Sequence, residues 1–113
     1  MIMKEGWIFK RSRYLQQWKK RYAVLTKDHL LTFREKGTYI NPTEAIKMDV
    51  CSTVKSSDDE INKEFSFKLD IAGTTFFFYA ESYEEKEGWI GALGRSMIKP
   101  SIMIDEAFDN EYM

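Results

Sequence analysis

The sequence predicts a mainly β domain in which seven antiparallel strands form a partly open barrel and one C-terminal α-helix caps it. Short runs that alternate apolar and polar side chains recur between residues 6 and 80, as expected for strands with one buried face. Brief turns separate many of these runs, and such close spacing favours hairpins, which join antiparallel strands. After residue 81 the apolar residues change to helical spacing.

The predicted strands follow one another along the first 80 residues. Trp7 and Phe9 alternate with polar or smaller neighbours, so their side chains share one face of the first strand. Gly37, Asn41 and Pro42 mark a loop near the middle of the series. Strands are expected at Gly6–Lys10, Lys19–Thr26, Leu30–Glu35, Ala45–Val50, Ser52–Lys55, Phe65–Ile71 and Thr74–Ala80, with loops at Ser12–Trp18, Lys36–Thr43 and Ser56–Lys63.

The closing helix is predicted to begin after Ser82 and to end before Pro100. Ser82 and Glu85 have the spacing of a capping box, in which the serine hydroxyl accepts from a free backbone N–H at the helix start. A stripe on one helical face follows, made of Lys86, Trp89, Ile90, Leu93 and Met97. Because a helix with one apolar face needs a surface to cover, we expect it to close the open end of the barrel.

Length and composition indicate one globular domain at residues 1–99, followed by a flexible acidic tail or linker at 100–113. The chain has 113 residues, 43% of them hydrophobic and 15% aromatic. No apolar run is as long as a membrane span, and the N-terminus lacks the apolar core of a signal peptide. The single cysteine, Cys51, favours a reducing cytosolic compartment. A second interpretation of the tail is that it folds over a basic pocket.

Basic residues gather at the first predicted hairpin. Six of the twelve residues from Lys10 to Arg21 are Lys or Arg, although the net charge of the chain is −1. Residues 1–36 carry a charge of +7 and residues 37–113 a charge of −8. Like charges that face each other across a hairpin are destabilising. The cluster therefore indicates an anion-binding site, although a solvated hairpin tip would give the same composition.

Several motifs resemble those of the pleckstrin homology (PH) domain family. They are E-G-W-I-F-K at 5–10, W-K-K-R-Y-A-V-L at 18–25, L-L-T-F-R-E at 30–35 and the late helix that carries Trp89. Their order and intervals match the family over roughly residues 4–98. The resemblance implies the partly open barrel with its C-terminal helix. It also implies a membrane-recruitment module that binds phosphoinositide headgroups or soluble inositol phosphates.

The resemblance further implies which residues bind the headgroup. Members of high affinity have a Lys late in the first strand and a Lys/Arg-x-Arg early in the second, which here are Lys10, Lys19 and Arg21. Residues two apart on a strand share a face, so these three cations can converge at one end of the sheet. Arg11 and Arg13 are expected to form the rim of the site, and Arg34 to line the same pocket.

Two further expectations concern selectivity and membrane contact. The trio is typical of members that recognise PI(3,4,5)P3 or PI(3,4)P2, in which a third-strand tyrosine also donates to a phosphate. This chain is expected to have Phe33 at that position, and a phenyl ring cannot donate. At the loop tip, Tyr14 and Leu15 are predicted to contact the membrane, while Trp18 packs on the barrel flank.

Other functions are less well supported by the sequence. No nucleophile with a base partner and no set of metal ligands is apparent, so we expect neither an enzyme nor a metal or cofactor site. An acidic pI of about 5.9 argues against nucleic acid as a partner. The alternative is a protein-interaction domain with weak or no lipid selectivity, since one fold hosts several functions. We expect a cytoplasmic monomer that is recruited to the anionic surface of the plasma membrane or of another phosphoinositide-containing membrane.

Overall fold

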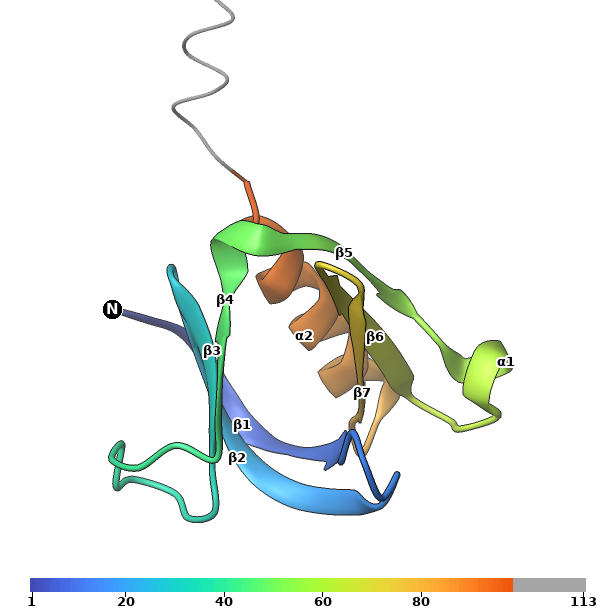
Figure 1. Ribbon diagram of the computed structural model, residues 1–113, viewed down its shortest axis with the longest axis horizontal. Coiled ribbons are helices and arrows are strands. Elements are labelled where there is room, and N and C mark those ends of the chain that lie inside the picture. The colour runs from blue at the N-terminus through green and yellow to red at the C-terminus, as the bar shows by residue number, and fades with distance from the viewer. Residues whose placement is uncertain (99–113) are drawn as a thin grey trace, which may run out of the picture.

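The computed structural model describes residues 1–98 and has the predicted fold class. Seven antiparallel strands and a C-terminal helix make up most of the domain (Figure 1). The strands are β1 (Ile2–Arg11), β2 (Trp18–Thr26), β3 (His29–Phe33), β4 (Glu44–Lys47), β5 (Cys51–Ser56), β6 (Ser66–Ile71) and β7 (Thr74–Tyr79). The helices are the single turn α1 (Asp58–Ile61) and the long α2 (Tyr83–Ser96). The predicted tail at 100–113 lies outside the described residues.

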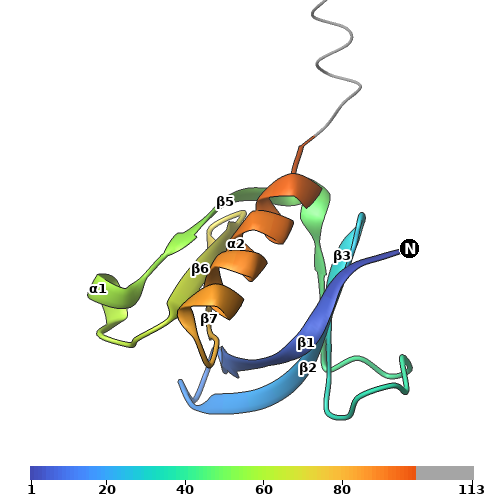
Figure 2. The same ribbon diagram turned by 180° about the vertical axis from the view of Figure 1, so that it is seen from behind.

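The strands form one curled sheet that does not close on itself. Their order is β4-β3-β2-β1-β7-β6-β5, so β4 and β5 are the two edges although they are neighbours in the sequence. One turn of 3₁₀ helix, Met48–Val50, carries the chain from one edge to the other. The long helix α2 lies across the open side of the curled sheet (Figures 1 and 2).

The core lies between the inner face of the sheet and α2. Trp89 and Leu93 of α2 are completely buried, as are Leu25, Phe67 and Phe78 of the sheet. Burying such side chains stabilises the fold by about 1.5–3 kcal/mol each. The helix begins as predicted, because the Ser82 hydroxyl accepts from the backbone N–H of Glu85 at 3.1 Å.

Most predicted boundaries differ from the structure by one or two residues, and three segments differ more. Strand β1 begins at Ile2 rather than Gly6, because Ile2–Glu5 continues the pairing with the end of β2. The strand predicted at 45–50 stops at Lys47, where Met48 turns into the core and the chain changes direction. The loop predicted at 56–63 contains the single turn α1. Of these segments, Met48–Val50 carries the chain between the two sheet edges, a change of direction that the period of the sequence does not reveal.

A carboxylate fixes the β5–β6 connection to the long helix. Asp58 accepts hydrogen bonds from Lys86 Nζ at 2.6 Å and from the backbone N–H groups of Phe65 and Ser66 at 3.0 and 3.1 Å. Lys86 also donates to the Ser56 hydroxyl at 2.7 Å. These bonds explain why a lysine stands in the buried stripe of α2, since a buried ammonium requires polar partners. Burial acts to raise the pKa of Asp58, but its hydrogen bonds to Lys86, Phe65 and Ser66 outweigh that effect and lower it.

We predict that Asp58→Asn lowers the free energy of unfolding by about 2 kcal/mol at neutral pH, because hydrogen bonds to charged groups are worth ~1.5–3 kcal/mol. Urea denaturation measures this difference. The matched control is Asp59→Asn, which removes an exposed carboxylate beside it in the same turn and should change stability little.

The loss of unfolding free energy in Asp58→Asn should depend on pH. A carboxyl group whose pKa is lowered in the folded state stabilises the fold above its unfolded pKa, and this contribution is lost as the pH falls through the folded value. The deficit of Asp58→Asn should therefore persist at neutral pH and shrink below the ordinary Asp pKa of 3.8. A deficit that is equal at pH 7 and pH 3 would contradict this assignment.

Candidate functional site

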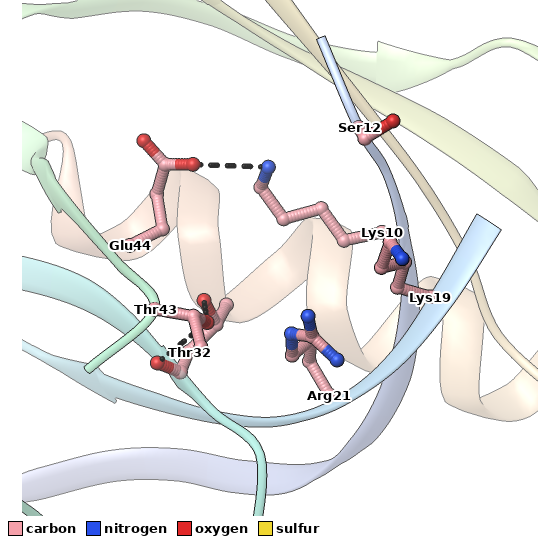
Figure 3. Close-up of a pocket in the computed structure, with 7 residues that line it drawn as sticks. All are labelled: Lys10, Ser12, Lys19, Arg21, Thr32, Thr43 and Glu44. Atoms are coloured by element: carbon pink, nitrogen blue, oxygen red, sulfur yellow. Dashed lines mark hydrogen bonds and ion pairs between the residues drawn. The ribbon is translucent and has the colours of Figure 1, made fainter. Parts of the chain in front are cut away.

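A small pocket lies at the end of the barrel where β1 and β2 meet their connecting loop. Its volume is about 90 Å³. Figure 3 shows cationic and hydroxyl side chains from three strands and their loops around it, with one carboxylate at its edge. The lining residues are Lys10, Ser12, Lys19, Arg21, Thr32, Thr43 and Glu44.

The pocket is built from the inward-facing positions of the strands, at the point where they change from apolar to polar. On β2, Ala23 and Leu25 belong to the core, and Arg21 precedes them on the same face. On β1, Lys10 follows Ile8 in the same way. The same change occurs from Leu30 to Thr32 on β3 and from Ile46 to Glu44 on β4. The site is therefore the polar rim of the hydrophobic core.

Lys10 is the most enclosed cation of the site. Only 8% of its surface is exposed, and its ammonium lies 3.0 Å from Glu44 Oε1. The ammonium also lies 5.2 Å from the centre of the Phe76 ring, a cation–π distance. Glu44 thus uses part of the charge and hydrogen-bonding capacity that the Lys10 ammonium could offer to another anion.

Lys19 and Arg21 contribute charge that the protein does not neutralise. Lys19 stands directly opposite Lys10 in the β1–β2 pairing, and Arg21 stands opposite Ile8. Within residues 1–98, no carboxylate lies within ion-pairing distance of either side chain. Burial lowers the pKa of Arg21, and the nearby charge of Arg34 lowers it further.

None of the three remaining predicted arginines lines the pocket, and of these only Arg13 lies at its rim. Arg13 reaches the rim, 3.7 Å from the other oxygen of Glu44. Arg11 points to the outer face, where its guanidinium lies 4.4 Å from the centre of the Phe77 ring. Arg34 borders a separate depression beside the β3–β4 loop, although its charge acts on Arg21.

The tip of the β1–β2 loop has the exposure expected of a membrane-contacting segment. Tyr14 and Leu15 are 89% and 70% exposed. Trp18, by contrast, packs edge-on against Tyr79 with ring centres 4.9 Å apart. The prediction that Trp18 packs on the barrel flank is therefore confirmed.

Phe33 was expected at the third-strand position where other members place a phosphate-binding tyrosine, and this prediction is wrong, because Phe33 does not line the pocket. Phe33 is 2% exposed and packs with Tyr22 and Val24 in a small cluster on the outer face of the sheet. Its neighbour Thr32 faces the pocket instead, and its hydroxyl lies 2.7 Å from that of Thr43. The alternation of β3 accounts for this, since Thr32 shares a face with the core residue Leu30. The same reasoning would have identified Glu44; Ser12 and Thr43 lie in loops and give no such signal.

A hydrogen-bonded contact fixes the loop that leads to Thr43 and Glu44. Tyr22 and Tyr39 both donate to Glu5 Oε1, at 2.8 and 2.9 Å. Burial and the bond to Glu5 raise the pKa of Tyr22 to about 12. Because Tyr39 belongs to the β3–β4 loop and Glu5 to β1, this contact anchors the loop to the outer face of the sheet.

The described residues offer little for metal binding or membrane spanning. Within residues 1–98, no group of three or more His, Cys, Asp or Glu side chains could hold a metal ion. Neither described helix is long and apolar enough to cross a bilayer.

The seven strands form an open barrel that α2 caps, and a cationic pocket lies at its rim. The chain belongs to the PH domain family, which it matches over residues 2–97. It is 33% identical over 108 residues to pleckstrin homology domain-containing protein 1 of Arabidopsis thaliana, covering 92% of this chain and 74% of that protein. It is also 38% identical over 98 residues to pleckstrin homology domain-containing family A member 6 of Homo sapiens, of which it spans only 9%.

Solved PH domains share the fold. The C-terminal PH domain of pleckstrin in complex with D-myo-Ins(1,2,3,5,6)P5 superimposes with a TM-score of 0.76 at 27% identity, over 87% of this chain and 97% of that one. The Slm1 PH domain in complex with D-myo-inositol 4-phosphate gives a TM-score of 0.74 at 25% identity, over 88% and 98%. PH domains are generally non-catalytic, and membership supports lipid binding or protein interaction.

We predict that Phe33→Ala lowers the free energy of unfolding by about 3 kcal/mol, because it leaves a cavity beneath Tyr22 and Tyr39. Thr32→Val keeps the shape of the neighbouring side chain and removes only its hydroxyl, so its cost should be about 1 kcal/mol. Chemical denaturation of both variants measures the difference. Equal costs would contradict the packing of Phe33 in a buried apolar cluster.

Proposed function

We propose that this PH domain is a membrane-recruitment module that binds phosphoinositide headgroups in the rim pocket. The observation that carries the proposal is the convergence of Lys10, Lys19 and Arg21 on one small pocket, with two of the three free of any ion pair among residues 1–98. Such an arrangement is electrostatically unfavourable by itself and becomes favourable when an anion binds.

Each cation has a distinct role in this proposal. Arg21 presents a planar fork for bidentate contact with a phosphate, whereas Lys10 and Lys19 act as point charges from the two sides. The hydroxyls of Thr32 and Thr43 are available as donors to phosphate or ring oxygens. The remaining cations, Arg11, Arg13 and Arg34, lie outside the lining of the pocket and strengthen the long-range attraction for a polyanion or an anionic leaflet.

The solved relatives support an inositol phosphate as the ligand, because PH domains of similar structure were crystallised with such molecules. We propose that PI(3,4,5)P3 or PI(3,4)P2 is preferred, on the basis of the Lys10, Lys19 and Arg21 arrangement. Soluble inositol phosphates with the same phosphate pattern would occupy the same pocket. The domain would act as a cytoplasmic, non-catalytic monomer, with Tyr14 and Leu15 entering the headgroup region.

We predict that Lys10→Ala and Arg21→Ala each abolish measurable binding to phosphoinositide vesicles at physiological salt, since each removes a charge that faces the phosphates. Vesicle co-sedimentation against a panel of all phosphoinositides measures both affinity and isomer preference. The matched control is Lys20→Ala, because Lys20 lies on the outer face over Trp7 and should retain binding.

The panel also separates headgroup recognition from membrane contact. A double variant Tyr14→Ser/Leu15→Ser should keep its affinity for a soluble inositol phosphate and bind vesicles less tightly. Thermal melting of every variant verifies that the fold survives. Binding by folded Arg21→Ala at the level of the unsubstituted chain would refute the proposed site. An equal response to all phosphoinositides would refute only the isomer preference.

We further predict that Glu44→Gln tightens headgroup binding about fivefold, or ~1 kcal/mol, because it removes a negative charge from the pocket and frees the Lys10 ammonium. Isothermal titration with a soluble inositol phosphate measures the change. Glu35→Gln removes an exposed acid outside the pocket and serves as the control. Weaker binding by Glu44→Gln would mean that the ion pair positions Lys10 for the ligand rather than competing with it.

A further inference from the structure

A wide apolar groove lies at the other end of the β1–β2 ladder from the rim pocket. Its volume is about 710 Å³. It lies between the first residues of β1, the β2–β3 turn and the C-terminal end of α2. The lining residues are Met1, Met3, Thr26, Lys27, Asp28, Arg95, Ser96 and Ile98.

Apolar side chains in this groove lack cover from the described part of the chain. Met3 is 37% exposed and Ile98 is 56% exposed, and neither belongs to the buried core. Exposed apolar residues that gather in one groove can form a docking site. Lys27 and Arg95 are the basic side chains that line it, and Asp28 is the acidic one. The groove therefore favours an occupant that combines apolar residues with net negative charge.

The chain itself supplies a segment of that chemistry. Residues 99–113 read K-P-S-I-M-I-D-E-A-F-D-N-E-Y-M, so three consecutive apolar residues, Ile102–Ile104, are followed directly by Asp105 and Glu106. The segment starts at the groove, because Ile98 is one of its lining residues. The residues between Ile98 and Ile102 can span at most roughly 3.3–3.6 Å each, which keeps the apolar triplet close to the groove.

We propose that residues 102–106 dock into this groove, with Ile102–Ile104 against Met3 and Ile98, and Asp105 and Glu106 beside Lys27 and Arg95. The match to the plant relative includes part of this segment. It covers 92% of the chain and so necessarily extends past Ile98. The inference is independent of headgroup binding, because the groove and the rim pocket share no lining residue.

Paramagnetic relaxation in the full 113-residue chain tests the proposal. A nitroxide is attached at Ala107→Cys in a Cys51→Ala background, so that it lies beside the docked segment without replacing any of its residues. The expected result is strong broadening of the backbone amides of Met3 and Lys27, several-fold greater than that of Lys19 and Arg21. Broadening centred on Lys19 and Arg21 would overturn the proposal, because it would place the segment over the rim pocket.

Mixed samples identify the molecule that supplies the segment. Nitroxide-labelled chains at natural isotopic abundance are mixed with ¹⁵N-labelled chains that lack the nitroxide. No broadening is expected in this mixture. Broadening in the mixture would show that a second copy fills the groove and would overturn the proposal. Uniform broadening in the first sample, in which every chain carries the nitroxide, would also overturn it, because the groove would then be open to an external partner.

Substitutions then test the two chemical parts of the contact. Ile102→Ser/Ile104→Ser should remove the selective broadening, whereas Tyr112→Ser, outside the proposed segment, should preserve it. Arg95→Glu should weaken the broadening, and Asp105→Lys in the same chain should restore it by exchanging the two charges. Persistence of the full effect in the double serine variant would overturn the proposal.

Discussion

The architecture depends on a very short connection between the two halves of the sheet. Strand β1 pairs with β2 along nearly its whole length but with β7 only through Phe9 and Lys10, opposite Tyr79 and Phe78. Beyond these two pairs the halves diverge, and α2 covers the space between them (Figure 1). Its Trp89 side chain is completely buried. Lys10 is therefore held at the junction by backbone pairing on both sides, so the central cation of the site has a fixed position.

This placement has an electrostatic cost that the surroundings reduce only in part. Lys10 and Lys19 are direct neighbours across β1 and β2, an arrangement that is unfavourable for like charges. Glu44 relieves the repulsion for Lys10 but leaves Lys19 and Arg21 without a carboxylate among the described residues. The fold tolerates this because Trp89 and the rest of the core provide its stability, while the rim remains polar and accessible to an anion.

The fold class could be predicted from local periodicity, whereas the grouping of Lys10, Lys19 and Arg21 also needed the resemblance to PH domains. The alternation of β2 places Lys19 and Arg21 on one face, and the spacing of Trp89 and Leu93 identifies the buried face of α2. Other features depend on how distant segments meet. The ion pair between Lys10 and Glu44 joins residues from two strands that are not adjacent in the sheet. The bonding of Lys86 by Asp58 likewise joins α2 to the β5–β6 connection.

The composition of the pocket is also linked to contacts on the opposite face of the sheet. Thr43 and Glu44 enter the pocket at the end of the β3–β4 loop, and that loop is anchored on the outer face where Tyr39 and Tyr22 share the carboxylate of Glu5. Phe33 packs beneath the same loop, against Tyr39. Because side chains on β3 alternate between the faces, Thr32 lines the pocket while the next residue, Phe33, packs in the cluster on the outer face. A change in the outer contact would therefore alter which groups line the rim pocket, without replacing any of its residues.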